Sequence, residues 1–461
     1  MPDLKPHIFR ANDIRGLVGE DLTDETVEVL GQAWGTWLRR NGQDRCTLGR
    51  DCRASSPGFA AALSRGMTSC GVHVVDIGIV PTPLLYFSMF HLDIDAGVMI
   101  TGSHNPKDFN GFKVCSGKSA LFGADIVEIG RIARSHEFAE GRGDVSCQDV
   151  LPAYLDRVVS DQRLGPRELK VVVDAGNGTG GVVAIPLFQR LGIETIPLYC
   201  EMDGDFPHHH PDPTVADNLE DLRHKVLETE ADVGIGFDGD ADRIGVVTET
   251  GEVLYGDMLL LILALALLRE NPGAEIVSEV KCSQVLFDEI ERAGGRAVMW
   301  KVGHSFIKAK MAENGALLGG EMSGHIFFRH RWYGFDDAIY SSLRLLEVLS
   351  RTDRPISRLL DDISMKKSTP EIRIECPDEI KFRVVEAMTQ LFQSKNDDVL
   401  EVCDIDGVRV RFPHGWGLVR SSNTQPVLVF RFEADSEEAL QSISTAMLAK
   451  AEEIKKRVLE S

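Results

Sequence analysis

Residues 233–248 read VGIGFDGDADRIGVVT: an apolar run, a cluster of carboxylates and a second apolar run. The first run predicts a buried strand that ends at Phe237, and Ile244 begins a returning strand. Asp238, Asp240 and Asp242 follow the first strand at alternate positions. A solvated acidic turn is the plainer interpretation, because Asp and Gly are common in turns. The functional interpretation is a cation site at the end of a strand.

The surroundings of the three carboxylates indicate which cation they suit. Counted from Asp238, Glu249 falls at the twelfth place of a calcium loop, but Arg243 stands at the sixth place, where that loop needs glycine. Three carboxylates are also fewer ligands than calcium takes. They suit Mg2+ completed by a phosphate oxygen and water. Arg243 can pair with phosphate in a forked geometry.

A second polar loop, TGSHNP, occupies residues 101–106 after the apolar run of 98–100. Gly102 permits close backbone approach and Pro106 interrupts regular structure, so Ser103 is expected at a loop tip. A hydrogen-bonded turn serine is the alternative. Phosphoryl transfer needs an activated nucleophile and charge neutralised on the moving group. Ser103 and the aspartates therefore predict phosphoryl transfer, with Lys113 as a further cation near the same anion.

Two more loops carry binding chemistry. Residues 320–325 read GEMSGH, in which Glu321 and Ser323 offer an acceptor and a hydroxyl for sugar hydroxyls, and His325 can move protons near neutral pH. Residues 420–426 read RSSNTQP, which places Arg420 beside hydroxyl and amide donors suited to a phosphate dianion. Taken singly, each loop also fits a polar surface turn.

The order of the expected elements predicts an α/β fold that ends in an α+β domain. Helices are expected over 26–39, 57–70 and 181–191, and strands over 72–77, 96–100 and 170–174; similar successions recur from Ala231 and from Ala274. The last part is expected to hold strands over 371–375, 408–412 and 427–432 and helices over 378–392 and 437–457. Polar stretches predict domains over 1–149, 150–254, 255–366 and 367–461.

The motifs TGSHNP, DGDADR, GEMSGH and RSSNTQP occur in this order along the chain, and they resemble the four signature loops of the alpha-D-phosphohexomutases. Met322, in third place of GEMSGH, and the segment GFDDAIYSSLRLLEVLS at 334–350 are similar to the bacterial phosphomannomutase/phosphoglucomutase branch. The resemblance implies three mixed α/β domains plus a C-terminal domain that resembles the TATA-box-binding protein fold, arranged around a central cleft.

The resemblance also implies a reaction and its residues. The reaction is reversible phosphoryl transfer between the 1- and 6-positions of mannose and glucose phosphates, with Mg2+, through phosphorylated Ser103 and a hexose 1,6-bisphosphate. A sugar loop that grips only the 3- and 4-hydroxyls tolerates both sugars. The implied catalytic residues are Ser103, His104, Lys113, Arg243 and His325; the metal ligands are Ser103, Asp238, Asp240 and Asp242; the substrate-binding residues are Asn12, Arg15, Lys281, His304, Lys308, Glu321, Met322, Ser323, Gly324, His325, Arg420, Ser421, Ser422, Asn423 and Thr424.

One position departs from the family pattern. Residues 10–16 read RANDIRG and resemble the family's amino-terminal cleft motif, but Asn12 stands where a tyrosine is expected, while Arg15 is retained. Losing an aromatic ring removes apolar contact area and a hydroxyl. We expect this change to affect sugar binding more than the chemistry.

The composition narrows the partners and the compartment. A net charge of −21 argues against nonspecific binding to nucleic acid or to anionic membranes. Nine cysteines without a C-x-x-C pair favour a reducing, cytoplasmic location, and the start of the chain lacks an apolar signal core. The apolar run at 258–268 is too short to cross a bilayer and predicts a buried helix. A monomer is expected, with small-molecule hexose phosphates as partners.

Several alternatives remain at this point. Gly176, Gly178 and Gly181 satisfy G-x-G-x-x-G between a strand and a helix, with Glu201 about 20 residues further on, as in a dinucleotide-binding oxidoreductase. A tight strand-to-helix turn is the structural alternative. A phosphoglucosamine mutase is the nearest substrate alternative. A phosphatase that hands the phosphoryl group to water and a sugar-phosphate sensor without catalysis complete the set.

Overall fold

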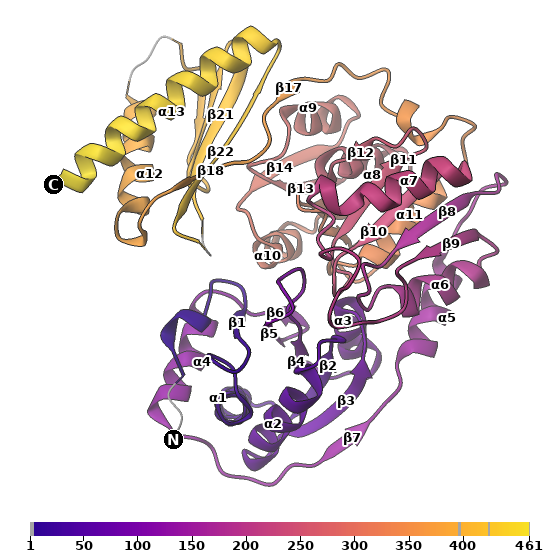
Figure 1. The fold of residues 1–461 in the computed structure, drawn as a ribbon, viewed down its shortest axis with the longest axis vertical. Helices are drawn as coiled ribbons and strands as arrows, with labels where there is room; N and C mark the ends of the chain where they lie inside the picture. The colour runs from indigo at the N-terminus through magenta and orange to yellow at the C-terminus, as the bar shows by residue number, and fades with distance from the viewer. Residues whose placement is uncertain (1–3, 395–397, 423–424, 461) are drawn as a thin grey trace.

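A computed structural model describes residues 4–394, 398–422 and 425–460. Figure 1 shows the chain as four successive sheet-containing units, with the N-terminal unit at the bottom and the C-terminal unit at the upper left. The first three units are mixed α/β and the last is an antiparallel sheet with two helices, so the predicted fold class is confirmed.

The first sheet has the strand order β1-β5-β4-β2-β3-β7, and β6 pairs with β5. β2, β3, β4 and β7 are parallel, while β5 runs antiparallel to both β4 and β1. Helix α1 begins with a reciprocal capping box between Thr23 and Thr26, and it carries acids in its first turn and arginines in its last, as the helix dipole favours. The elements are η1 (Pro6–Ile8), β1 (Ile14–Leu17), α1 (Asp24–Arg40), β2 (Arg45–Arg50), α2 (Ser56–Ser69), β3 (His73–Ile79), α3 (Thr82–His91), β4 (Gly97–Ile100), β5 (Phe109–Ser116), β6 (Ser119–Ala120), α4 (Ala124–Ser135) and β7 (Val145–Cys147).

The second sheet has the order β12-β11-β10-β8-β9, in which β9, β8 and β10 are parallel. β10 is the apolar run before the carboxylates and β11 is the returning strand, and the two pair antiparallel, as expected from the sequence. The elements are α5 (Leu151–Asp161), β8 (Lys170–Asp174), α6 (Gly181–Arg190), β9 (Glu194–Leu198), η2 (Ala216–Leu219), α7 (Glu220–Thr229), β10 (Val233–Phe237), β11 (Ile244–Thr248) and β12 (Val253–Leu254).

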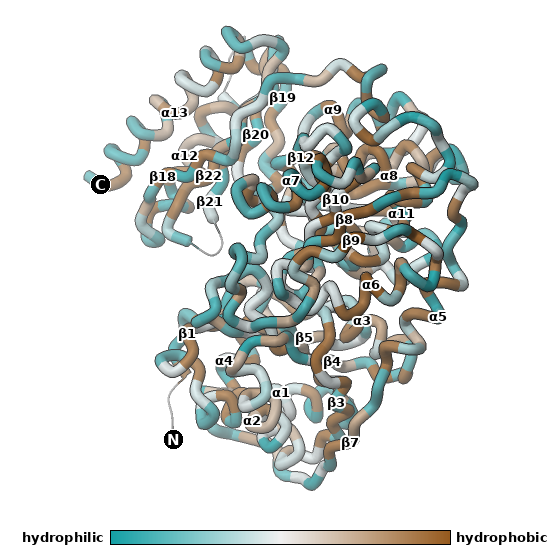
Figure 2. The backbone as a smooth tube through the Cα atoms, turned by 45° about the vertical axis from the view of Figure 1, so that its right-hand side comes forward, coloured by the Kyte–Doolittle hydropathy of each residue, from teal (hydrophilic) through white to brown (hydrophobic). Residues whose placement is uncertain are grey.

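The third sheet has the order β14-β13-β15-β16. Its helix α8 contains the apolar run 258–268, which is largely buried, and brown tube marks this helix as apolar in Figure 2. Within the described part of the chain, no helix is both long enough and apolar enough to cross a membrane. The elements are α8 (Gly256–Glu270), β13 (Glu275–Glu279), α9 (Gln284–Arg292), β14 (Arg296–Trp300), α10 (His304–Asn314), β15 (Leu318–Gly320), β16 (Ile326–Phe328), α11 (Ala338–Leu349) and η3 (Ile356–Arg358).

The fourth sheet is antiparallel, with the order β17-β22-β21-β20-β19 and with β18 also paired to β22. Strands β19 and β21 were not predicted from the sequence; β21 reads GWGLVRS, and its glycines weaken a strand pattern. The elements are β17 (Lys367–Ser368), β18 (Ile372–Glu375), α12 (Asp378–Gln393), β19 (Glu401–Cys403), β20 (Val408–Phe412), β21 (Gly415–Ser421), β22 (Val427–Ala434) and α13 (Glu437–Glu460).

The buried apolar side chains connect the units unequally. One continuous cluster runs through the first three, from Leu84 and Phe87 of α3 to Phe237 of β10 and Leu343 of α11. The fourth unit has a separate core between its sheet and its two helices. Only a small cluster of Val280, Trp416 and Leu418, with a few partly buried neighbours, joins the third and fourth units among the apolar clusters of the described residues. All nine cysteines are unpaired.

Candidate active site

A cleft of about 1280 Å3 lies where the four units meet. Its lining includes Ser103 from the first motif, Arg243 from the second, Glu321 from the third and Arg420 from the fourth. Loops that are more than 300 residues apart in the sequence therefore share one cavity. The lining is rich in cations, which compensates locally for the strongly negative net charge of the chain.

Ser103 lies at the end of the turn after β4 and is almost fully buried. Its Oγ donates a hydrogen bond to Asp238 Oδ2 at 2.7 Å and lies 3.1 Å from His104 Nδ1. Its backbone φ is +49°, a left-handed conformation that a residue with a side chain seldom adopts. The expected convergence of the hydroxyl with the carboxylate cluster is present.

Asp238, Asp240 and Asp242 are fully buried, and each contributes a ligand atom within 4.8 Å of the others. Burial and the neighbouring charges of Asp242 and Asp240 hold the pKa of Asp238 well above its usual range. Asp240 accepts hydrogen bonds from Thr82 Oγ1 at 2.5 Å and from Lys113 Nζ at 2.6 Å. Burial alone would raise the pKa of Asp240, but Lys113 outweighs it and the pKa is lowered.

Lys113 of β5 also forms an ion pair with Asp242, so its ammonium lies against two of the three carboxylates. Burial alone would lower the pKa of Lys113, but Asp240 and Asp242 outweigh it and raise the pKa. The sequence predicted a cation near the transferred anion; the structure brings this cation directly onto the carboxylate cluster. Lys113 therefore remains charged and offsets part of the negative charge there.

The carboxylate cluster fits a divalent ion. Asp240 Oδ1 and Asp242 Oδ1 are buried and have no hydrogen-bond partner among the described residues. Oxygen ligands of this kind suit a hard cation such as Mg2+. Such buried, unsatisfied acceptors are costly unless a cation or a donor occupies them. The described residues therefore hold an acidic group that can bind a metal ion.

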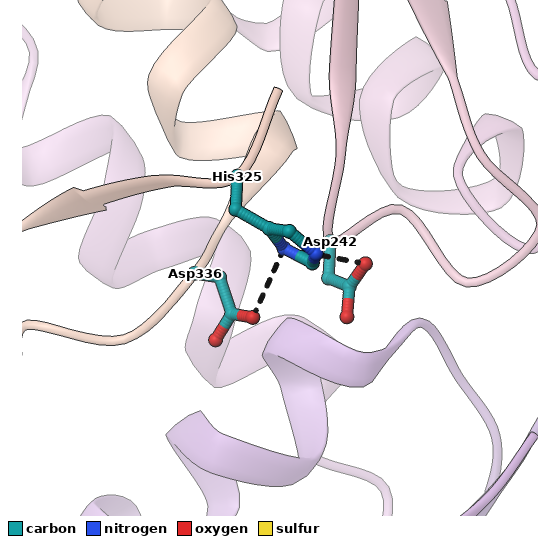
Figure 3. A group of neighbouring side chains, drawn as sticks. All are labelled: Asp242, His325 and Asp336. Carbon is teal, nitrogen blue, oxygen red and sulfur yellow. Dashed lines mark ion pairs between the residues drawn. The ribbon is translucent and has the colours of Figure 1, made fainter. Parts of the chain in front are cut away.

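His325 contacts Arg243 and two carboxylates. Figure 3 shows its ring between Asp242 and Asp336. Arg243 Nε donates to His325 Nε2 at 3.1 Å, so the neutral ring carries its proton on Nδ1. That Nδ1 faces Asp336 Oδ2 at 3.2 Å and Asp242 Oδ1 at 3.6 Å. Asp336, which the sequence analysis missed, fixes the orientation of the imidazole.

Asp336 also contacts two of the predicted substrate-binding side chains, Lys308 and His304. Lys308 Nζ donates to Asp336 Oδ1 at 2.7 Å and lies 4.3 Å from the centre of the Tyr86 ring. His304 Nδ1 lies 3.5 Å from Asp336 Oδ2, and burial together with the Lys308 charge holds the pKa of His304 well below its usual range. His304 lines the cleft; Lys308, in contrast, lies beneath the lining formed by the described residues.

The predicted sugar-binding loop, residues 320–325, forms a tight turn between β15 and β16. Gly324 has a φ of +88°, and a Cβ there would lie 2.3 Å from the carbonyl oxygen of Ile244, so this position requires glycine. Glu321 Oε1 accepts from the backbone N–H of Gly303 at 2.7 Å. Met322 and Ser323 line the cleft beside Glu321. The turn thus packs directly on the strand that follows the carboxylates.

The opposite wall holds the expected phosphate-binding loop. Arg420 is buried at the end of β21 and donates to Asp406 Oδ2 at 3.1 Å, and Ser422 lines the cleft. Ser421 Oγ instead donates to the carbonyl of Lys381 and does not contribute to the cleft lining given by the described residues. Asn423 and Thr424 lie outside the described residues.

Lys281 joins the third and fourth units across this wall. Its Nζ lies 3.3 Å from Glu371 Oε2 and 3.6 Å from Glu279 Oε1. Burial alone would lower the pKa of Lys281, but Glu279 and Glu371 raise it. Burial raises the pKa of Glu279 to about 7, and this carboxyl also accepts from the backbone N–H of Met322. The sequence analysis identified neither carboxyl.

The N-terminal segment reaches the same cleft. Asn12 and Arg15 are both in its lining. Arg15 donates to Asn105 Oδ1 at 2.7 Å and to Asp13 Oδ2 at 2.5 Å. A Cβ on Gly303 would lie 3.2 Å from Asn12 Nδ2, so the Asn12 amide abuts the start of α10. Asn12 therefore occupies the boundary between the first and third units.

The glycine-rich turn at 176–181 has a packing role. A Cβ on Gly178 would lie 2.6 Å from the carbonyl oxygen of Gly239, and Thr179 donates to that same oxygen. A Cβ on Gly181 would lie 2.4 Å from the Cys200 carbonyl. These glycines let the turn support the carboxylate loop, which agrees with the structural interpretation of this motif.

Comparison with known proteins extends these observations to the whole chain. Residues 6–140, 152–251 and 255–366 match the phosphoglucomutase/phosphomannomutase alpha/beta/alpha domains I, II and III, and residues 371–450 match the C-terminal domain. The phosphomannomutase/phosphoglucomutase of Pseudomonas aeruginosa is 48% identical over 444 residues, which cover 96% of this chain and 95% of that protein. The phosphoglucomutase of Neisseria gonorrhoeae is 44% identical over 452 residues, 97% of each chain.

A solved structure agrees with these relatives. The crystal structure of a phosphoglucomutase/phosphomannomutase family protein from Burkholderia thailandensis superposes with a TM-score of 0.93 at 42% identity and covers 98% of both chains. The family models match well over half of the chain, in the order of its four sheets. The chain therefore belongs to the phosphoglucomutase/phosphomannomutase family.

Proposed function

We propose that this chain interconverts the 1-phosphates and 6-phosphates of glucose and mannose by phosphoryl transfer through Ser103. The observation that carries the proposal is the 2.7 Å hydrogen bond from Ser103 Oγ to Asp238, the first of three buried carboxylates in a cation-lined cleft. The relatives named for phosphomannomutase and phosphoglucomutase activity support both sugars. The enzyme is an isomerase.

Ser103, carrying a phosphoryl group, starts the cycle. The 6-hydroxyl of a hexose 1-phosphate attacks phosphorus, the bond from phosphorus to Oγ breaks, and the hydroxyl proton passes to a base, which returns a proton to Oγ. Asp238, Asp240 and Asp242 would hold Mg2+, which when bound neutralises charge on the phosphoryl oxygens. Lys113 adds a positive charge against the same carboxylates. The product of this step is a hexose 1,6-bisphosphate.

His325 is the candidate base. Its Nε2 accepts from Arg243, so this nitrogen is released when Arg243 turns its guanidinium toward a phosphate. Asp336, at 3.2 Å from Nδ1, then stabilises the imidazolium that forms. Arg243 and His325 thereby link arrival of the anion to the capture of a proton.

The second half of the cycle needs the bisphosphate to turn round. Its other phosphorus then transfers to Oγ: the phosphorus–oxygen bond at carbon 1 breaks, the bond to Oγ forms, and the Oγ proton passes to the sugar oxygen. Arg420, Ser422, Asn423 and Thr424 form the proposed anchor, which recognises phosphate and not a particular end of the sugar. Lys281 and Arg15 add positive charge to the cleft lining.

Sugar tolerance follows from the third loop. Glu321 and Ser323 line the cleft. If they bind only the 3- and 4-hydroxyls, they make no contact that distinguishes glucose from mannose, because these sugars differ at carbon 2. Asn12 and Met322 line the same cleft. We infer turnover of both sugars, and a lower rate on glucosamine 1-phosphate.

An isomerisation assay tests the proposal directly. Glucose 1-phosphate, mannose 1-phosphate and glucosamine 1-phosphate are supplied in turn with Mg2+ and catalytic hexose 1,6-bisphosphate. We expect comparable turnover of the first two, lost in Ser103→Ala and retained in the control Ser160→Ala on the exposed side of α5. Selective glucosamine turnover would assign the chain to another branch. Stoichiometric release of free phosphate would indicate a phosphatase, and binding without turnover would indicate a sensor.

A further inference from the structure

Arg53 is a buried arginine, only 1% exposed, on the loop between β2 and α2. Its guanidinium donates to four backbone carbonyls within residues 102–109, the segment called the serine loop below. Nη2 donates to Ser103 at 2.8 Å and Asn105 at 2.7 Å, and Nη1 donates to Pro106 at 2.6 Å and Phe109 at 3.0 Å. Nε donates to Asp51 Oδ2 at 3.1 Å. All five N–H groups of one side chain are therefore used.

Asp51 extends this grip to the start of the loop. Its Oδ2 also accepts from the backbone N–H of Gly102 at 3.0 Å, and its Oδ1 accepts from Ser56 Oγ at 2.6 Å. The carboxylate is 2% exposed, so it neutralises the guanidinium inside the protein. The pair of Asp51 and Arg53 thus holds the chain from Gly102 to Phe109 by its backbone alone.

The conformation that this pair holds is a costly one. Ser103 has a φ of +49°, and such a conformation persists in a residue with a side chain only where the surroundings impose it. A Cβ on Gly102 would lie 2.4 Å from Arg53 Cζ, so the guanidinium packs flat against the loop. The result of this conformation is that Ser103 Oγ points at Asp238.

The other face of Arg53 is closed by the second unit. The Phe206 ring centre lies 5.0 Å from Arg53 Cζ, and a Cβ on Gly204 would lie 2.9 Å from Arg53 Cα. Lys107 of the serine loop pairs with Asp205 of the same segment at 3.0 Å. Residues 204–206 therefore cover the guanidinium and connect the serine loop to the unit that carries the three carboxylates.

We propose that Arg53 is a positioning residue for phosphoryl transfer: it aims Ser103 Oγ at the carboxylate cluster through the loop backbone, without contact with substrate. Arg53 is not part of the cleft lining given by the described residues. The inference rests on the proposed function of Ser103 as the phosphoryl acceptor and donor. Its consequence is that Arg53 controls the rate of the chemical step and has little effect on sugar binding.

The test compares Arg53→Lys and Arg53→Met with Arg344→Lys. Lysine offers three donors from one nitrogen and cannot reach all four carbonyls. Arg344 is a matched control, since it is similarly buried and hydrogen-bonded to Glu347, the His330 carbonyl and Tyr340, remote from the serine loop. Thermal unfolding, kcat, KM and the rate of phosphate incorporation into Ser103 from glucose 1,6-bisphosphate, followed by intact mass, are measured for each.

We expect Arg53→Lys to fold, to lower kcat and the phosphorylation rate about 100-fold and to leave KM within about threefold, because a misplacement near 1 Å costs about this much in rate. Arg53→Met is expected to lose more. The inference is overturned if kcat stays within about threefold of wild type, or if Arg344→Lys loses as much kcat for the same loss of stability. If wild type itself takes no phosphate on Ser103, the proposed function fails. If wild type is phosphorylated and the Arg53 variants match it in kcat and in the rate of phosphorylation, this inference alone fails. Should Arg53→Met not fold, Arg53→Lys decides.

Discussion

Replacing Gly239 with alanine tests whether catalysis depends on the close approach of two backbones. Gly239 lies between Asp238 and Asp240, and a Cβ there would be 2.5 Å from the carbonyl oxygen of Ser103. Ordinary van der Waals contact begins near 3.4 Å, so the carboxylate loop and the serine loop must separate by about 0.9 Å. The carboxylate loop cannot move away on its other side, because Gly178 packs against Gly239 there: a Cβ on Gly178 would lie 2.6 Å from the carbonyl oxygen of Gly239.

A separation of this size breaks the 2.7 Å hydrogen bond from Ser103 to Asp238. We expect kcat to fall about 100-fold, which corresponds to about 2.7 kcal/mol of lost transition-state stabilisation. The assay is conversion of glucose 1-phosphate to glucose 6-phosphate at saturating Mg2+ and activator. Gly58→Ala is the control, because Gly58 is exposed inside helix α2, where alanine is favoured. A Gly239→Ala enzyme with kcat within threefold of wild type would refute the reasoning.

Three further predictions follow from the same site. Asn12→Tyr is expected to change KM more than kcat in steady-state assays on both sugars, because Asn12 lines the cleft beside Gly303 at the start of α10. A large fall in kcat at unchanged KM would contradict this. Burial raises the pKa of Glu279 to about 7, so between about pH 4.5 and pH 7 the folded form holds a proton that the unfolded form has lost, and this carboxyl lowers the free energy of unfolding as the pH rises. Glu279→Gln should remove roughly 3 kcal/mol of this loss, measured by urea unfolding at pH 5 and pH 8. An unchanged dependence of the free energy of unfolding on pH would argue against it. Chelation of divalent ions by EDTA should reduce kcat by at least about 100-fold and added Mg2+ should restore it, because the buried Asp240 Oδ1 and Asp242 Oδ1 accept no hydrogen bond from the described residues. Full activity in EDTA would exclude this role.

The sequence predicted those parts of the molecule whose signal is local. The strand before the carboxylates, its returning partner and the buried helix over the run at 258–268 follow from apolar periodicity, and the structure confirms them. The loops that carry Ser103, Asp240, Glu321 and Arg420 were found because each concentrates polar chemistry within six or seven residues. Their meeting in one cleft came from the family resemblance, and the structure shows it.

Other features arise only from long-range packing, which a single sequence does not reveal. Asp336 lies in GFDDAIY, where it looks like a helix-capping acid, yet it contacts Lys308, His304 and His325. Arg53 lies in GRDCR, which carries no pattern typical of a site. Strand β19 was missed because it is only three residues long, and β21 was missed because its two glycines weaken the strand pattern. The domain boundaries at 149, 254 and 366, a monomeric state and a cytoplasmic location remain predictions.

The uneven distribution of apolar packing has a mechanical consequence. The hydroxyl and the three carboxylates belong to one rigid body, because a single apolar cluster passes through the first three sheets. The wall that carries Arg420 is a second body, joined to the first by a small apolar patch and by ion pairs such as the one between Lys281 and Glu371. Rocking of the C-terminal unit therefore exposes little hydrophobic area. Under the proposed function, this motion loosens the contacts with one end of a sugar phosphate while the reacting groups at the other end keep their alignment.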